Sequence, residues 1–194
     1  MARTITKADL MPMADYGRIR RDHRRKLVEL KARRRLLVGP FATFHFENYE
    51  TMWAQVHEML FIEKGGEGQV EGELAAYNPL IPQGRDLCAT MLIEIEDEIK
   101  RRHVLAGLGH IETMVSLAFA GETVAGIPTD DTERTTEDGK ASAVHFLHFR
   151  FTPAQIAKFR AAGTQVVLGI AHANYGHMAV MPEAMRESLA IDFE

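Results

Sequence analysis

The position of helical periodicity along the chain constrains its fold more than any other feature of the sequence. Apolar residues recur at three- and four-residue steps in residues 15–35, 49–64 and 68–77, and this spacing predicts three helices in the first half of the chain. Pro79 ends the third helix, because the residue before a proline avoids helical geometry. Helices that come first and are followed by strands are typical of an α+β protein.

Strand patterns occupy most of the remaining sequence. Alternating apolar and polar side chains mark the strands. Gly39-Pro40 is expected to break or bulge the first of them, and Ala120-Gly121 to turn a hairpin. The strand regions are expected at residues 36–48, 87–96, 110–128, 143–151 and 164–181, of which the third and the fifth are hairpins.

Two short helices are expected near the C-terminus. The first spans residues 152–163 and has a capping box, with Thr152 as the N-cap residue and Gln155 as its partner. The acidic, polar stretch at residues 129–141 has loop composition and is expected to be mobile. No linker divides the chain. We therefore predict a single α+β domain over residues 1–194, with N-terminal helices packed on a mostly antiparallel sheet and short C-terminal helices.

The first helix is strongly basic. From Lys7 to Arg35 there are eleven Lys or Arg residues and four Asp or Glu, a net charge of +7, so the remainder must carry −11 to give the net charge of −4. This asymmetry predicts an anionic partner for the helix, or docking of the helix against the acidic remainder of the chain. Because no nucleic-acid-binding motif is present, an acidic protein is the favoured partner. The candidate partner-binding residues are Arg21, Arg24, Arg25, Arg33, Arg34 and Arg35.

Polar residues also lie on the second helix, on or near its broad apolar face. Gln55 and Glu58 are three residues apart and share a face, and Glu63 follows about half a turn round the helix. A carboxylate that is partly buried needs a partner, which the arginines of the first helix can supply. We expect a structural network of ion pairs at this contact.

Several function classes lose their sequence support. There is no glycine-rich phosphate loop, nucleophile elbow, Cys-x-x-Cys pair or His-Glu-x-x-His metal motif. Cys88 is the only cysteine, which favours a reducing, cytoplasmic compartment, and it has no basic neighbour in the sequence to support a reactive thiol. No segment approaches the ~20 apolar residues of a membrane span.

The stretch AHANYGHMAV in the last hairpin is a candidate metal site. If ANYG is a four-residue turn with its glycine in the left-handed region, His172 and His177 face each other at the hairpin tip. A single iron or zinc ion would then need further ligands, for which His145 is the first candidate and Glu112 or Glu94 could add a carboxylate. The alternative is a solvated hairpin tip in which both rings are hydrogen-bonded.

A small-ligand pocket beneath the segment YNPLIP is a further candidate. Tyr77 and Asn78 could orient a polar group there. Tyr175, in the hairpin, is the third candidate ligand-binding residue, and it could also move protons beside a metal ion.

Several motifs of this chain resemble those of the uncharacterised bacterial family numbered 3501 among the domains of unknown function. They are RRR followed by VGP, FEN before the second helix, Q-x-x-EM at Gln55–Met59, YNPLIP, and H-x-x-Y-x-H at His172–His177. The similarity covers roughly residues 14–189. The family has no established activity. The resemblance implies a genomic context: such proteins are commonly encoded beside a rubrerythrin-like protein and an iron–sulfur-binding oxidoreductase.

Two functions follow as hypotheses. The first is an accessory or docking protein of a rubrerythrin/iron–sulfur electron-transfer or peroxide-stress system, which would associate with its partner in a salt-sensitive way. The alternative is a metal-binding protein or metal-dependent enzyme whose histidine site lies at the C-terminal hairpin. A ligand pocket at YNPLIP ranks third.

Overall fold

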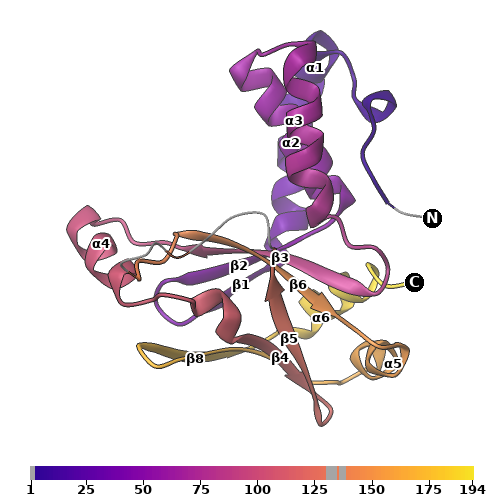
Figure 1. The fold of residues 1–194 in the computed structure, drawn as a ribbon. Helices are drawn as coiled ribbons and strands as arrows, with labels where there is room; N and C mark the ends of the chain where they lie inside the picture. Colours follow the sequence, from indigo (N-terminus) through magenta and orange to yellow (C-terminus); the bar gives the residue numbers. More distant parts are fainter. Residues whose placement is uncertain (1–2, 130–134, 136–138) are drawn as a thin grey trace.

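The structure, a computed structural model, contains the three N-terminal helices that the sequence predicts, and each lies within three residues of its expected position (Figure 1). It describes residues 3–129, 135 and 139–194, so the stretch at 129–141 for which we predict a mobile acidic loop lies mostly outside the described residues. The α-helices are α1 (Met13–Ala32), α2 (Tyr49–Glu63), α3 (Glu67–Tyr77), α4 (Glu98–Ala106), α5 (Pro153–Arg160) and α6 (Glu183–Ala190).

Capping boxes fix the starts of two of these helices. In α2 the side chain of Asn48 accepts a hydrogen bond from the N–H of Thr51, and the hydroxyl of Thr51 accepts one from the N–H of Asn48, each at 2.9 Å. In α5 the capping box predicted for Thr152 and Gln155 is present. Such caps satisfy N–H groups that a helix leaves unpaired at its first turn.

The strands form one eight-stranded antiparallel sheet within the described residues, which confirms the α+β class. Its spatial order is β1-β2-β3-β6-β5-β4-β7-β8. Most neighbouring strands are also neighbours in sequence; the exceptions are the pairs β3·β6 and β4·β7. The strands are β1 (Arg35–Val38), β2 (Ala42–Glu47), β3 (Asp86–Ile93), β4 (Val115–Phe119), β5 (Glu122–Pro128), β6 (Val144–Arg150), β7 (Val166–His172) and β8 (Tyr175–Val180).

The prediction of one strand over residues 36–48 is wrong, because the chain reverses there and forms the β1–β2 hairpin. Gly39 has a φ of +70°, a conformation that side chains with a Cβ rarely adopt, and it makes this tight reversal possible. Leu36 then pairs with Phe44 across the hairpin. Of the two alternatives expected at Gly39-Pro40, a break or a bulge, the structure therefore has the break, in the form of a turn.

Helix α4 is not predicted by the sequence analysis, which extends the second strand region, residues 87–96, to Glu96. The strand ends at Ile93, and Asp97 caps the new helix by accepting a hydrogen bond from the N–H of Lys100 at 2.7 Å. The alternation of apolar residues continues past Ile93 to Ile95, so the pattern alone does not show where pairing stops.

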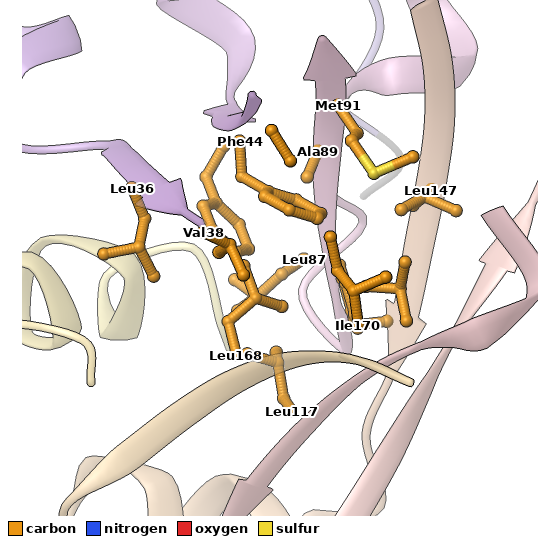
Figure 2. Packing of buried hydrophobic residues seen from close by; sticks show 14 of the residues in the cluster. Leu36, Val38, Phe44, Leu87, Ala89, Met91, Leu117, Leu147, Leu168 and Ile170 are labelled. Atoms are coloured by element: carbon orange, nitrogen blue, oxygen red, sulfur yellow. The ribbon is translucent and has the colours of Figure 1, made fainter. Parts of the chain in front are cut away.

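The sheet curls so that its two edge strands, β1 and β8, come into contact. Buried side chains from both halves of the sheet fill the space inside the curl. Figure 2 shows that aliphatic and aromatic residues from distant strands pack against one another in this core. Those labelled are Leu36, Val38, Phe44, Leu87, Ala89, Met91, Leu117, Leu147, Leu168 and Ile170.

A second, smaller apolar cluster lies among α2, α3 and the N-terminal segment. It contains Ile5, Val56, Leu60 and Val70, and Phe146 of β6 packs against it from the sheet. In Figure 1 the helices α1, α2 and α3 stand together on one side of the sheet. None of the helices in the described ranges is long and apolar enough to span a membrane.

Candidate functional site

The arginines of α1 and of the turn that follows it divide into two groups. Arg34 is only 2% exposed: it pairs with Asp192 and donates to the carbonyls of Phe46 and Glu47 at 2.9 and 3.0 Å. Arg34 is therefore not available to a partner, contrary to the prediction. The other candidate partner-binding residues, Arg21, Arg24, Arg25, Arg33 and Arg35, are exposed.

Acidic residues of the chain neutralise only part of this basic segment. Arg25 and Arg35 form exposed ion pairs, with Asp22 at 3.3 Å and with Glu94 at 3.6 Å. In the described part of the chain, Arg21, Arg24 and Arg33 take part in no ion pair. Docking against the acidic remainder of the chain thus explains some of the basic residues but leaves three guanidinium groups facing solvent.

Glu58 forms the partly buried ion pair that the sequence analysis expects between the first two helices. Arg20 donates to both of its carboxylate oxygens, at 2.9 and 2.7 Å, and the hydroxyl of Tyr16 donates to it at 2.7 Å. The hydrogen bonds from Arg20 lower the pKa of Glu58. The pKa of Tyr16 is raised, first by burial and then by its hydrogen bond to Glu58.

A groove of about 400 Å³ lies beside this ion pair. It is lined by Gly17, Arg20, Arg21 and Arg24 of α1 and by Phe61 of α2. The two helices approach closely here. A Cβ added to Gly17 would lie only 3.1 Å from the ring of Phe61. The guanidinium carbon of Arg20 lies 4.9 Å from the centre of that ring. The groove therefore combines an aromatic floor with positive charge.

The candidate metal site at the last hairpin depends on a four-residue turn, and the prediction of that turn is wrong. The chain reverses over Ala173-Asn174 alone, and Gly176 does not have a positive φ. Tyr175 therefore pairs with His172, whereas His177 pairs with Ile170. Ala173 and Asn174 do not have a positive φ either. They therefore differ from the type I′ and II′ turns that two-residue hairpins favour, in which at least one turn residue has a positive φ. Instead, tertiary contacts stabilise the turn: the side chain of Asn174 donates to the carbonyl of Gly107 at 2.8 Å.

The ring nitrogens of His172 are both engaged by the backbone. Nδ1 accepts a hydrogen bond from the N–H of Asn174 at 3.1 Å, so Nε2 carries the proton and donates to the carbonyl of Gly109 at 3.2 Å. His177 packs edge-on against the ring of Tyr175, with the ring centres 4.5 Å apart. The two histidines thus support the hairpin rather than face a common ligand.

His145 and Glu112 do meet, as a buried pair with Nδ1 3.3 Å from the carboxylate. Nε2 of His145 contacts the carbonyl of Ser142 at 2.8 Å. No three of His145, Glu112, His172 and His177 bring ligand atoms within 4.8 Å of one another in the part of the chain that the structure describes. The predicted histidine-rich ligand set does not assemble.

Tyr175 belongs to the core and not to a ligand pocket. Its hydroxyl accepts hydrogen bonds from the N–H groups of Phe41 and Ala42, at 2.8 and 2.9 Å, and donates to the carbonyl of Val38 at 2.8 Å. These three bonds connect β8 to the β1–β2 hairpin at the other edge of the sheet. The hydroxyl therefore has a structural role.

The segment YNPLIP does border a cavity, of about 540 Å³. Asn78 lines it, but its side chain is occupied: it accepts from the N–H of Ile5 at 2.7 Å and donates to the carbonyl of Ile5 at 2.9 Å. The hydroxyl of Tyr77 has a long contact, 3.5 Å, with the amide of Gln55. Asn78 thus holds the N-terminal segment in place beside the cavity.

A group that the sequence analysis missed lines the same cavity. Asp86 and Cys88 lie two residues apart on β3, and His148 is opposite Cys88 on β6. The sulfur of Cys88 lies 3.2 Å from Nδ1 of His148 and 3.5 Å from the carboxylate of Asp86, and Nδ1 lies 3.3 Å from that carboxylate. Asp86 and His148 border the 540 Å³ cavity, and His148 also borders a neighbouring one of about 330 Å³.

Burial and charge keep the thiol of this group protonated. The pKa of Cys88 is raised first by burial and then by the negative charge of Asp86. Burial alone would raise the pKa of Asp86 as well, but hydrogen bonds from His148, from the backbone N–H of Gln83 and from Cys88 together lower it. The result is an ionised carboxylate beside a neutral thiol.

Comparison with known proteins finds a matching family model and a similar solved structure. A family model described as "Protein of unknown function (DUF3501)" matches residues 4–193. A crystal structure described as a novel protein of unknown function from Burkholderia pseudomallei is 37% identical in sequence, with a TM-score of 0.91. The alignment covers 99% of this chain and 100% of that one. No curated protein matches the chain.

Proposed function

The chain belongs to the DUF3501 family of proteins of unknown function, and for it we propose an accessory role in which the exposed arginines of α1 bind an acidic partner protein. The observation that carries this proposal is that Arg21, Arg24 and Arg33 are exposed and form no ion pair within the described residues. Exposed charge of one sign attracts a partner of the opposite sign and speeds its association.

The groove beside Phe61 gives the surface a specific binding feature. An aspartate or glutamate side chain that enters it would meet the guanidinium groups of Arg21 and Arg24, which can each form paired hydrogen bonds with a carboxylate. Val28 lies on the same side of the helix, one to two turns further on, and is 67% exposed. Arginine next to a half-buried aromatic ring and an exposed aliphatic side chain is typical of a protein interface, where arginine and aromatic residues are enriched.

The ion pairs of Arg25 and Arg35 do not remove these residues from the surface. Both pairs are exposed, and such pairs contribute about 0–1 kcal/mol. A partner carboxylate can therefore replace Asp22 or Glu94 at little cost. These two arginines extend the proposed surface from the groove toward β1.

The partner that we propose is a protein of a rubrerythrin/iron–sulfur electron-transfer or peroxide-stress system in the cytoplasm. Its support is the genomic context that the family resemblance implies, together with the charge of α1. The partner would supply the redox metal, since the chain holds one cysteine and no paired Glu-x-x-His motif. In this role the protein positions or regulates its partner.

Charge reversal tests the proposal. We would measure the affinity of the chain for a purified rubrerythrin-like protein of the same organism, and compare Arg21→Glu/Arg24→Glu with the unchanged chain. Reversal of two charges at the interface is expected to weaken binding by at least about tenfold, equivalent to ~1.4 kcal/mol. The matched control is Lys100→Glu/Arg102→Glu on α4, which lies away from α1 (Figure 1).

Two outcomes would contradict the proposal. One is that the control double variant loses as much affinity as the α1 double variant, because net charge rather than α1 would then govern association. The other is that neither the rubrerythrin-like protein nor its iron–sulfur partner binds the unchanged chain at low ionic strength.

A further inference from the structure

The face of β3 and β6 that points toward the helices brings three different metal-ligand types together. Asp86 supplies a carboxylate oxygen, Cys88 a sulfur and His148 a ring nitrogen, and all three ligand atoms lie within 4.8 Å of one another. Alternation along β3 puts Asp86 and Cys88 on one face, and antiparallel register puts His148 directly beside Cys88. The group is therefore fixed by the rigid centre of the sheet.

The separations within the group match those around a tetrahedral metal ion. Zinc binds nitrogen at about 2.0–2.1 Å, carboxylate oxygen at about 2.0–2.2 Å and sulfur at about 2.3 Å, so tetrahedral angles place these atoms about 3.3–3.6 Å apart. The observed separations are 3.2, 3.3 and 3.5 Å. An ion can thus enter with only small adjustments of the three side chains.

Buried negative charge around Cys88 favours a cation. Glu47 pairs with Cys88 across β2 and β3 and is 7% exposed. It accepts hydrogen bonds from the hydroxyls of Thr51 and Thr90, at 2.7 and 2.8 Å, but forms no ion pair within the described residues. Asp192, by contrast, is paired with Arg34. The carboxylates of Asp86 and Glu47 therefore have no full positive counter-charge of their own.

The group is also oriented and accessible. The N–H of Gln83 donates to the second carboxylate oxygen of Asp86 at 2.6 Å, which fixes the rotation of that carboxylate. The side chains of Asp86 and His148 are 14% and 19% exposed, and they open onto the 540 Å³ cavity. A fourth ligand can reach the ion from this cavity.

We propose that Asp86, Cys88 and His148 form a mononuclear site for a divalent transition metal, best fitted by zinc, with a fourth position open to the cavity under α3. Mixed sulfur, nitrogen and oxygen ligands select such an ion over magnesium or calcium, which prefer oxygen ligands. On binding, the Cys88 thiol gives up its proton to solvent and the thiolate bonds to the metal. Three protein ligands with an open fourth position are the arrangement of catalytic rather than structural zinc.

Metal titration of the untagged, metal-free protein tests this site independently of the docking role. Zinc binding would be measured by competition with a coloured chelator, and cobalt(II) would be added as a spectroscopic probe. We expect one zinc per chain, and a thiolate-to-cobalt charge-transfer band that is absent from Cys88→Ser. Cys88→Ser, His148→Gln and Asp86→Asn should each weaken zinc binding by more than about 100-fold, beyond the 10–100-fold typical of outer-shell changes.

The control is His103→Gln on α4, an exposed histidine away from the cavity, whose zinc binding should equal that of the unchanged chain. Near-ultraviolet circular dichroism would show which variants fold. If Cys88→Ser does not fold, His148→Gln decides, because this side chain is partly exposed. The proposal is overturned if the unchanged chain binds no zinc, or if zinc binding survives in a folded ligand variant.

Discussion

The hydroxyl of Tyr175 donates a hydrogen bond to the carbonyl of Val38 at 2.8 Å, and so joins the two opposite edge strands of the sheet. Val38 is the last residue of β1 and Tyr175 the first of β8, 137 positions apart in the sequence. The same hydroxyl accepts from the two N–H groups at the start of β2. One phenol therefore closes the curled sheet where the two edges meet.

Tyr175→Phe should destabilise the fold by about 1–3 kcal/mol, because it leaves a carbonyl and two N–H groups without their partner in a mostly buried place. Urea unfolding measures this loss. Tyr77→Phe is the control: its hydroxyl has only the 3.5 Å contact with Gln55, so its loss should stay below about 0.5 kcal/mol. Equal losses in the two variants would show that the Tyr175 hydroxyl has no special role.

Gly39→Ala should be more damaging than a similar change at another glycine with positive φ. A Cβ on Gly39 would lie 2.5 Å from the ring of His177, and the φ of +70° adds a cost of about 1–2 kcal/mol. At Gly163, with a φ of +74° and nothing within 4 Å of the added Cβ, only the backbone cost applies. Adding His177→Ala to Gly39→Ala should recover part of the lost stability, because the Tyr175 hydroxyl, at 2.8 Å from the added Cβ, would still be too close. Additive losses in the double variant would refute the steric account.

Arg34→Lys should cost at least about 3 kcal/mol, because one ammonium group cannot replace the contacts of this buried guanidinium with Asp192 and three backbone carbonyls. Arg33→Lys, one residue earlier and exposed, should change stability by less than about 0.5 kcal/mol. Thermal unfolding of the two variants side by side makes the comparison. If Arg34→Lys is as stable as the unchanged chain, the structural role of Arg34 would be refuted and Arg34 would again be a candidate partner-binding residue.

Glu58 should contribute to the loss of stability in acid. Because its pKa in the folded state is lowered by Arg20, its stabilisation is fully present above the unfolded-state pKa of about 4.3 and is lost as the pH falls through the folded-state pKa. Glu58→Gln should therefore reduce stability at pH 7 and flatten its decline below about pH 4.3. Glu96→Gln, an exposed change of the same charge, should leave the pH profile unaltered. Identical profiles for the unchanged chain and Glu58→Gln would contradict the assignment.

Much of the fold could be predicted because its signals are local. Apolar periodicity indicated the three N-terminal helices, and Thr152 and Gln155 indicated the start of α5. A break or a bulge was expected at Gly39-Pro40, but the reversal of the chain into the β1–β2 hairpin was missed, because a bulge and a tight turn share the same Gly-Pro signal. The need for a glycine at this turn is partly long-range, because a Cβ at residue 39 would clash with His177 and Tyr175, which lie at the far end of the chain.

The candidate sites were harder to predict, because motif residues proved to have structural partners. Arg34 and Asn78 lie in the segments that carry the family resemblance, and each binds a distant residue or backbone group. Cys88 seemed isolated because its basic neighbour, His148, lies 60 residues away and meets it only through the pairing of β3 with β6. Strand order, which sequence patterns do not specify, brings Cys88 and His148 together.

The dependence of partner affinity on ionic strength tests the central claim about α1 most directly. We would measure the Kd for the rubrerythrin-like protein from low salt to about 1 M, where the Debye length falls to about 3 Å. Binding through exposed guanidinium groups predicts that the affinity of the unchanged chain falls at least about tenfold over this range, and that Arg21→Glu/Arg24→Glu removes most of this dependence. An affinity that does not change with salt would contradict the account.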